Sequence, residues 1–381
     1  MEGNAPKATV RLFVCGDVMV GRGIDQILPH PSDPRLFEPQ VRSALEYVAL
    51  AERAAGEIPR RSGFDYVWGD AGDVWRRLKP AVRIINLETS VTTSQAADPA
   101  KGIHYRMHPE NVRCLIAAEV NCCVLANNHV LDWGRPGLDE TLQVLRMNGI
   151  QTAGAGRDDS EAGAPAVMGV PSARVLVYGL TFPSSGTPRA WRARPNQAGV
   201  NWFADVSAQT AQAIGRRIAA ERQPDDLIVV SLHWGGNWGY EVREFEQDFA
   251  HRLIDAGVSL VHGHSSHHPR GIEVYREKAV LYGCGDLVND YEGISGYESF
   301  RPELSMMYFP ELMAGSGRLV AMILVPMRMR RFRLQRASVA EAAWLLARME
   351  RECSKWGVRV RAGQGGMLHL EWPREPPVIS D

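Results

Sequence analysis

The sequence predicts an α/β protein whose sheets are covered by helices on both faces. Short runs rich in β-branched and other apolar residues alternate along the chain with longer segments in which apolar residues recur at helical spacing. Several of the short runs are apolar without interruption, which is the pattern of strands buried on both faces. Folds of this class carry their functional residues on loops that follow the carboxyl ends of strands.

The predicted elements follow one another in a regular order. Strands are predicted over residues 9–15, 82–86, 122–126, 174–180, 227–232, 258–261, 272–275 and 279–282. Helices are predicted over residues 41–55, 70–78, 109–118, 135–148, 206–222 and 244–256. The segment 183–202, rich in Pro, Ser, Arg and Trp, is the main predicted loop, and it is either a lid or a surface excursion.

The last part of the chain changes character. Two strands, 317–325 and 327–334, are predicted to join through Pro326, followed by a helix over 339–356 and a short strand near 367–372. Basic and apolar residues alternate in 328–333, which indicates a strand with one solvated face. We therefore expect a main domain over residues 9–300 and a strand-helix extension over 301–381 that packs on the same domain.

Composition excludes several classes of partner. The 381 residues include 43 basic and 44 acidic side chains, so the net charge favours neither nucleic acid nor an anionic membrane. No stretch approaches the roughly 18 apolar residues of a membrane span, and the N-terminus has no apolar targeting core. The six cysteines form no CxxC pair and are expected to act as small buried hydrophobes. We expect a cytoplasmic protein with reduced thiols.

A histidine-rich run marks the candidate site. Four of the eleven histidines fall within seven residues directly after the predicted strand 258–261: His262, His264, His267 and His268. Imidazole is the commonest neutral metal ligand near neutral pH, and several on one loop can converge on one cation. The run therefore predicts a metal or acid/base site.

Four other predicted strands also end in polar side chains: Asp17, Glu88, Asn127-Asn128-His129 and His233. Taken singly, Asp17 could cap a helix, Glu88 could belong to a buried ion pair, and the two asparagines could form a turn. Their joint occurrence at strand ends favours one site. Mixed carboxylate, amide and imidazole ligands suit Mn²⁺, Zn²⁺ or Fe²⁺ better than Ca²⁺.

These motifs resemble the bacterial CapA family, named for poly-γ-glutamate capsule synthesis, which looks like a branch of the calcineurin-like metallophosphoesterases. The resemblance rests on Gly16-Asp17, Asn86-Leu87-Glu88, Asn127-Asn128-His129 with Asp132-Trp133-Gly134, His233-Trp234-Gly235, and Gly263-His264 through Gly271-Ile272-Glu273. It covers nearly the whole chain and implies a four-layer α/β sandwich of two mixed sheets flanked by helices. The motifs are more specific for the family than for a substrate.

The resemblance also implies roles for individual residues. Asp17 and His267 would bind a first metal, and Glu88 would stand where a bridging Asp is usual. Asn128, His233 and His264 would bind a second metal, and His129 would be the general acid. Such cations polarise a phosphoryl or carbonyl oxygen and activate water.

Three positions depart from the superfamily pattern. Met19 replaces the histidine of an Asp-x-His motif, one extra residue separates His264 from His267, and Glu88 replaces Asp. One or two divalent ions are therefore expected, and with one ion Asp17 and His267 would be suited to paired acid/base work. Neither His262 nor His268 has an assigned role.

Two residues are expected to bind substrate. Arg22 is a candidate anion clamp, with a surface salt bridge as the alternative. Trp234, together with Trp238 and Tyr240, is expected either to form an aromatic wall or to belong to the core.

The predicted function is metal-assisted hydrolysis. The expected substrate is a small molecule or a peptide that carries a phosphoryl group or a carboxylate. One alternative is epimerisation of a peptide or amino-acid residue, by removal and return of a proton next to a metal-polarised carbonyl. The other is a non-catalytic accessory protein of polyglutamate capsule synthesis. The pattern specifies neither the substrate nor the oligomeric state.

Overall fold

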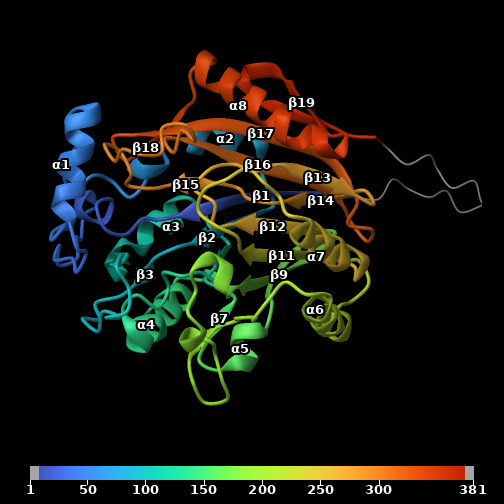
Figure 1. Cartoon of the computed structure of the whole chain (residues 1–381), viewed down its shortest axis with the longest axis horizontal. Helices are drawn as coiled ribbons and strands as arrows, with labels where there is room; N and C mark the ends of the chain where they lie inside the picture. The colour runs from blue at the N-terminus through green and yellow to red at the C-terminus, as the bar shows by residue number, and fades with distance from the viewer. Residues whose placement is uncertain (1–7, 374–381) are drawn as a thin grey trace, which may run out of the picture.

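The computed structural model describes residues 8–373 and contains two large mixed sheets (Figure 1). In the ten-stranded first sheet, β1 lies between the parallel strand β2 and the antiparallel strand β16. The order is β19 (Arg359–Ala362), β20 (Leu368–Glu371), β17 (Leu319–Arg330), β16 (Leu304–Met313), β1 (Thr9–Val18), β2 (Val82–Leu87), β5 (Cys122–Val124) and β6 (Gln151–Ala153), with β15 (Asp286–Val288) beside β1 and β18 (Arg333–Arg336) beside β17.

The second sheet has a parallel centre and antiparallel edges. Its order is β13 (Ile272–Tyr275), β14 (Lys278–Leu281), β12 (Leu260–His264), β11 (Leu227–His233), β9 (Ala173–Thr181) and β8 (Ala166–Val170). Two short pairs stand apart from both sheets, namely β3 (Ser90–Val91) with β4 (Arg106–Met107) and β7 (Ala155–Gly156) with β10 (Gly199–Val200).

Alternating side chains of β1 show how the sheets stack. Leu12 and Val14 belong to a core cluster that also contains Val229 of the second sheet. Phe13 and Cys15 point the other way, into a cluster shared with helices. Because successive side chains of a strand point to opposite faces, the two sheets pack face to face and each has an outer face to cover.

Helices cover these two outer faces (Figure 1). The first sheet is covered by α1 (Ala44–Ala55), α2 (Ala71–Leu78), α3 (Arg113–Ala117) and α4 (Gly134–Met147), and the second by α6 (Ala208–Glu221) and α7 (Glu244–Asp255). Short α5 (Asp159–Gly163) packs on β7, and α8 (Val339–Cys353) packs on β13, β17 and β19. The predicted α/β class and its four layers are confirmed.

The predicted pair of strands around Pro326 is wrong. One strand, β17, runs through Pro326, and the chain turns only at Arg331 and Phe332, both with positive φ. The Pro326 carbonyl accepts a hydrogen bond from the Ala337 N–H, so its nitrogen faces the gap between β18 and β20. No ladder hydrogen bond is lost there, which is why a proline is tolerated.

The prediction also missed β6, β8, β15, β16 and β19, as well as the two-residue strands β3, β4, β7 and β10. The longest of them, β16, contains Pro310, an unusual residue inside a strand. The segment 183–202 is partly folded, with 3₁₀ turns at Pro183–Ser185 and Arg189–Trp191 followed by β10. Strands from both sides of residue 300 share the first sheet. The division into a main domain over residues 9–300 and an extension over 301–381 stays a prediction.

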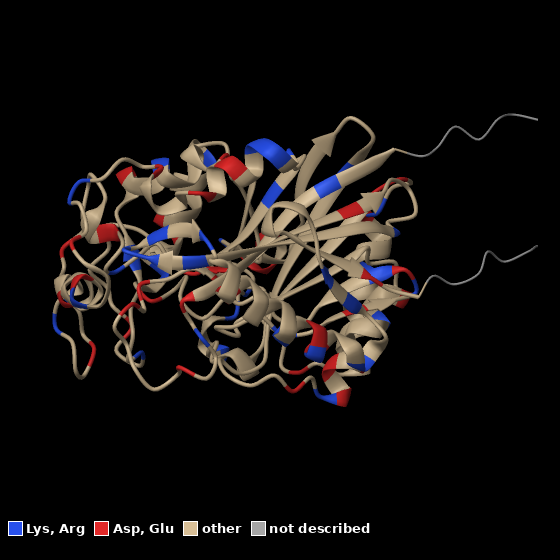
Figure 2. Cartoon of the chain, turned by 90° about the horizontal axis from the view of Figure 1, so that it is seen from above, with Lys and Arg blue, Asp and Glu red and all other residues tan. Residues whose placement is uncertain are grey.

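Charged residues lie mainly on helices and loops, where both signs are interspersed, while the strands carry few (Figure 2). All six cysteines are buried with free thiols, as expected. Among residues 8–373, no helix combines the length and apolar character needed to cross a membrane.

The contact between Gly16 and Gly285 is testable. A Cβ at residue 16 would clash with the Gly285 carbonyl oxygen, whereas a Cβ at Gly169 in β8 would meet no atom within 4 Å. Urea unfolding should show that Gly16→Ala lowers the free energy of unfolding by about 1–3 kcal/mol. The control Gly169→Ala should change it by less than about 1 kcal/mol. Equal stability of the two variants would contradict this account.

Candidate metal centre

Strand register brings the predicted site residues together. In the first sheet Asp17 lies opposite Asn86 of β2 and opposite Asp286 of β15. In the second sheet His233 and His264 are paired as the last residues of β11 and β12. Because these parallel strands end at the same edge, their polar side chains meet where the two stacked sheets come together.

Asp17 lies at the centre of the group and is fully buried. Its Oδ1 accepts a hydrogen bond from Asn86 Nδ2 at 2.7 Å and lies 3.8 Å from His264 Nδ1. Its Oδ2 is buried without a hydrogen-bond partner. An unpartnered carboxylate oxygen in the interior is energetically costly, so this position suits a bound cation.

Glu88 follows β2 and is also buried. Its Oε1 lies 3.6 Å from His233 Nε2 and 3.9 Å from His129 Nε2. Burial raises the pKa of Glu88 well above its usual range, and the neighbouring Asp17 carboxylate raises it further. Burial together with the Asp286 carboxylate likewise raises the pKa of Asp17. Asp17 and Glu88 lie side by side and both resist ionisation, so a nearby positive charge is needed to keep both of them ionised.

The two strand-end histidines face each other. His233 Nδ1 lies 2.8 Å from His264 Nδ1, and His233 Nε2 lies 3.1 Å from Asn128 Oδ1. Burial lowers the pKa of both imidazoles well below their usual range, which favours the neutral form that binds metals. Asp17, His233 and His264 each offer a ligand atom within 4.8 Å of the other two.

A second group shares Asp17. It contains Asp17, His267 and Asp286, whose ligand atoms also lie within 4.8 Å of one another. His267 Nδ1 lies 2.8 Å from Asp286 Oδ1. Burial is the largest single influence and opposes the charged imidazole, but the Asp286 and Asp17 carboxylates together raise the pKa of His267. Asp17 is thus placed between two sets of donors.

Sequence reasoning missed Asp286, although a signal was present. The tripeptide Cys-Gly-Asp occurs twice, at residues 15–17 and 284–286, and the structure pairs the two copies side by side through β1 and β15. Met19, which stands at the expected histidine position, is buried, and its Sδ accepts a hydrogen bond from the Tyr291 hydroxyl at 3.6 Å. Asp286 thus adds a carboxylate beside Asp17 that the expected motif does not contain.

His129 and Asp132 form a dyad beside the centre. His129 Nδ1 lies 2.6 Å from Asp132 Oδ2, which also accepts the Tyr105 N–H at 2.8 Å. This contact orients the ring so that Nε2 faces Glu88. Burial, followed by the charge of Lys101, lowers the pKa of His129 well below its usual range. The dyad has the geometry of an imidazole held by a carboxylate for proton transfer.

Only two members of the histidine run face the centre, His264 and His267. His262 Nδ1 lies 3.0 Å from Ser231 Oγ and its Nε2 lies 2.8 Å from the Cys15 carbonyl oxygen, so both nitrogens have structural partners. His268 Nε2 accepts the Gly239 N–H at 3.0 Å.

Arg22 is bound by carboxylates in the interior. Its guanidinium is buried, so it forms no surface salt bridge, and it binds Asp290 through two contacts of 2.9 and 2.6 Å. Glu38 adds a third contact at 3.1 Å. These carboxylates take up three of the five N–H groups of the guanidinium, and Arg22 lines the adjacent cavity. Its role as an anion clamp stays a prediction.

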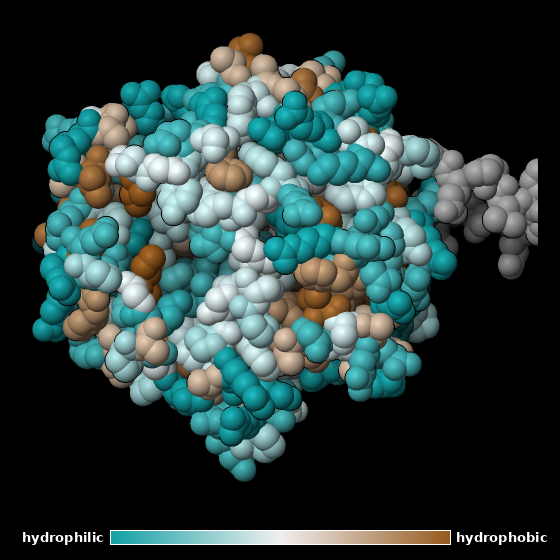
Figure 3. All heavy atoms as spheres, in the orientation of Figure 1, coloured by the Kyte–Doolittle hydropathy of each residue, from teal (hydrophilic) through white to brown (hydrophobic). Residues whose placement is uncertain are grey.

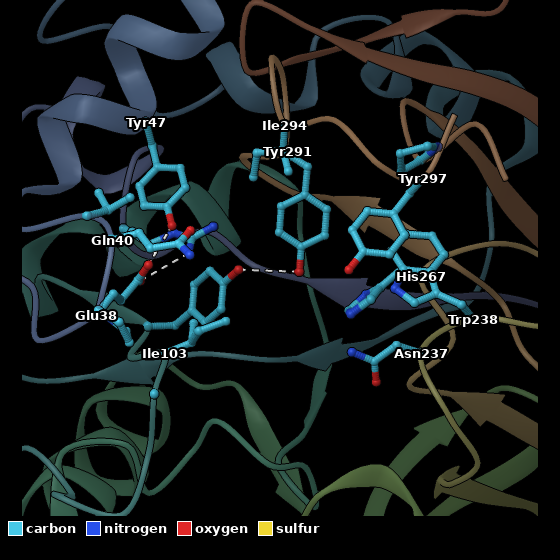
Figure 4. A pocket seen from close by; sticks show the side chains of 16 residues that line it. Glu38, Gln40, Tyr47, Ile103, Asn237, Trp238, His267, Tyr291, Ile294 and Tyr297 are labelled. Atoms are coloured by element: carbon cyan, nitrogen blue, oxygen red, sulfur yellow. Dashed lines mark hydrogen bonds and ion pairs between the residues drawn. The ribbon is translucent and has the colours of Figure 1, made fainter. Parts of the chain in front are cut away.

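Trp234 belongs to the core, as its alternative interpretation stated. It is 1% exposed, packs with Phe249, and donates a hydrogen bond from Nε1 to the Tyr282 carbonyl oxygen at 3.1 Å. The neighbouring Trp238 instead lines a cavity of about 560 Å³ that also reaches His267 (Figure 4).

Comparison with known proteins places this architecture in a family. The family model described as bacterial capsule synthesis protein PGA_cap matches residues 11–291. A probable polyglutamine synthesis accessory protein of Mycobacterium tuberculosis is 47% identical over 373 residues, which cover 97% of this chain and 97% of that protein. The PGA biosynthesis protein CapA of Bacillus subtilis is 26% identical over 279 residues, covering 72% of this chain and 62% of that protein.

Among solved structures, a 5'-nucleotidase precursor from Thermus thermophilus aligns with a TM-score of 0.48 and 16% identity, covering 89% of this chain and 59% of that chain. The family match spans most of the sequence, and the mycobacterial relative extends it over almost the full length. The expected resemblance to CapA is confirmed, and the chain belongs to the bacterial capsule synthesis protein PGA_cap family.

Proposed function

We propose that the chain is a metal-dependent hydrolase with two divalent cations, Mn²⁺, Zn²⁺ or Fe²⁺, at the strand ends. The observation that carries the proposal is the fully buried Asp17, shared by two groups of donors and with one oxygen unpartnered. One cation would be held by Asp17, His233 and His264, with Glu88 and Asn128 completing the set. The other cation would be held by Asp17, His267 and Asp286.

The cations, when bound, would supply Lewis-acid polarisation of a phosphoryl oxygen. The chain's own residues then have distinct tasks. The His129 ring, whose Nδ1 contacts Asp132 Oδ2, would donate a proton from Nε2 to the leaving oxygen when the ring is doubly protonated, and the burial that lowers its pKa makes this form a stronger acid. Burial raises the pKa of Asp132 to about 7, and the charge of Lys101, whose Nζ lies 3.6 Å from Asp132 Oδ1, opposes that rise. We favour phosphomonoesters over amides because of the family resemblance to metallophosphoesterases.

Hydrolysis is better supported than epimerisation. The epimerase alternative rested on a first metal position that lacks a ligand, with Asp17 and His267 free to move protons. In the structure Asp286 lies beside both residues and offers the further donor. Asp17 and His267 are therefore more useful as ligands than as an acid/base pair.

A second proposal concerns biological context. The mycobacterial relative is called a probable polyglutamine synthesis accessory protein and the Bacillus relative a PGA biosynthesis protein. We propose that this chain also serves synthesis of such a polymer in an accessory role, by the hydrolytic activity. Its cytoplasmic location stays a prediction.

Replacing a central ligand should remove metal. His264 is fully buried at the end of β12, whereas the side chain of His30 is exposed and is not among the donors of either group. After loading with Mn²⁺ and gel filtration, elemental analysis of His264→Ala should show roughly tenfold weaker retention or complete loss. His30→Ala is the matched control and should keep the wild-type content. Full metal content in His264→Ala would show that the ligand assignment is wrong.

The proposed role of Asp286 predicts a change in stoichiometry. Calorimetric titration of Asp286→Asn with Mn²⁺ should show one binding event where the wild type shows two, because the amide cannot supply the anionic ligand. Asp226→Asn is the control, since Asp226 pairs with Arg174 and belongs to neither donor group. Two unchanged events in Asp286→Asn would assign this carboxylate only to orienting His267.

The general-acid role of His129 predicts dependence on the leaving group. For phenyl phosphate, kcat of His129→Gln should fall by about 10²–10⁴. For p-nitrophenyl phosphate the loss should be much smaller, because nitrophenolate departs without a proton. Equal losses on both esters would exclude proton donation by His129. A metal-loaded wild type that hydrolyses neither ester would contradict the phosphomonoesterase proposal itself.

A further inference from the structure

The cavity beside the candidate metal centre has a composition that selects among substrates. Its volume is about 560 Å³, and it reaches His267, which also belongs to the second donor group. Figure 4 shows Glu38 and Tyr47 on one side, Trp238, Tyr297 and His267 on the other, and Tyr291 with Ile294 between them. A substrate with one end at the centre would extend into this space.

The cavity wall offers no uncompensated positive charge. Apart from tyrosines, its ionisable side chains are Arg22, Glu38 and His267. The single charge of Arg22 faces two carboxylates, Asp290 and Glu38, and His267 is paired with Asp286. A polyanionic chain such as polyglutamate needs a counter-charge for each carboxylate it buries. This wall does not supply one.

The wall is instead rich in rings and apolar groups. Five aromatic side chains line it: Tyr47, Tyr105, Trp238, Tyr291 and Tyr297. Tyr297 and Trp238 stack with their ring centroids 4.1 Å apart and their planes at 11°, which forms a flat wall on the side of His267.

The mouth of the cavity is apolar as well. On the face shown in Figure 3, hydrophobic residues occur only in small groups between hydrophilic ones. Of the ten exposed large hydrophobic side chains in residues 8–373, three line this one cavity: Ile103, Ile294 and Tyr297. Their exposure leaves apolar surface in contact with water, and a bound apolar group would cover it.

We propose that this cavity binds an uncharged ring, aromatic or otherwise apolar, of a phosphomonoester whose phosphoryl group lies at the candidate metal centre. The inference rests on the proposed function. In the reaction, the bond between phosphorus and the ester oxygen breaks, a water oxygen forms the new bond to phosphorus, and the departing oxygen takes up a proton. The cavity would then hold the released alcohol or phenol.

The proposal is tested by binding of non-hydrolysable probes to the Mn²⁺-loaded protein. Phenylphosphonate carries an uncharged ring, and 3-phosphonopropionate carries a carboxylate at a similar distance. Calorimetry should give a Kd roughly tenfold lower for phenylphosphonate. Equal affinities, or tighter binding of the carboxylate, would overturn the proposal.

Variants at the mouth locate the effect. Tyr297→Ala combined with Ile294→Ala should raise the Kd for phenylphosphonate roughly fivefold and leave that for 3-phosphonopropionate unchanged. Both side chains are about two-fifths exposed, at 41% and 39%, so the fold should survive. Ile103→Ala tests the opposite part of the mouth with the same expected selectivity. The control is Phe245→Ala, which is 50% exposed and does not line this cavity.

The outcomes separate the two proposals. Ring-selective binding that depends on Tyr297 and Ile294, without hydrolysis of phenyl phosphate, would contradict the proposed function and keep the binding site. Hydrolysis of phenyl phosphate without ring-selective binding would support the proposed function and overturn the assignment of this cavity. The same holds if the protein hydrolyses the ester and the mouth variants leave the ring selectivity intact.

Discussion

The close approach of two backbone segments at Gly16 and Gly285 positions the centre. The Asp17 N–H donates to the Gly285 carbonyl oxygen at 3.0 Å, and any side chain at residue 16 would clash with that carbonyl. This contact joins β1 and β15 in parallel and sets Asp17 beside Asp286. A contact from His262 to the Cys15 carbonyl oxygen then ties β1 to the second sheet. One short stretch of β1 therefore holds both sheets in the register that the centre requires.

The resulting geometry works against stability. Asp17, Glu88 and Asp286 are all at most 2% exposed, and burial raises the pKa of Asp17 and Glu88, which disfavours their charged forms. The same burial lowers the pKa of the His233 and His264 imidazoles, whereas the carboxylates beside His267 raise its pKa. Hydrogen bonds from Asn86 offset part of this cost, but one oxygen of Asp17 has no partner. An arrangement that is unfavourable for folding alone is understandable where cations complete it.

The sequence predicts those features of the molecule that depend on a single strand or helix and on the residues directly after it. Apolar runs located β1, β2, β11 and β12, and the polar residues at their ends were found because each follows its own strand. Asp286 was missed because β15 has only three residues, and its position depends on pairing with a strand almost 270 residues earlier. The partner of Arg22 could not be predicted for a related reason. Asp290 is distant in sequence, so no local pattern shows that the guanidinium is already bound.

Under the two proposals, the centre would carry the chemistry and the cavity would recognise the substrate. The centre is made of carboxylates, imidazoles and an amide at strand ends, where the sheet fixes their positions. The cavity is made largely of side chains from connecting segments, including Glu38, Trp238, Ile294 and Tyr297. The donor group at the centre touches the cavity through His267. Loops tolerate substitution better than strands. Under the proposed function, changes in these connecting segments would therefore alter the ring that the cavity accepts without moving a metal ligand at the strand ends.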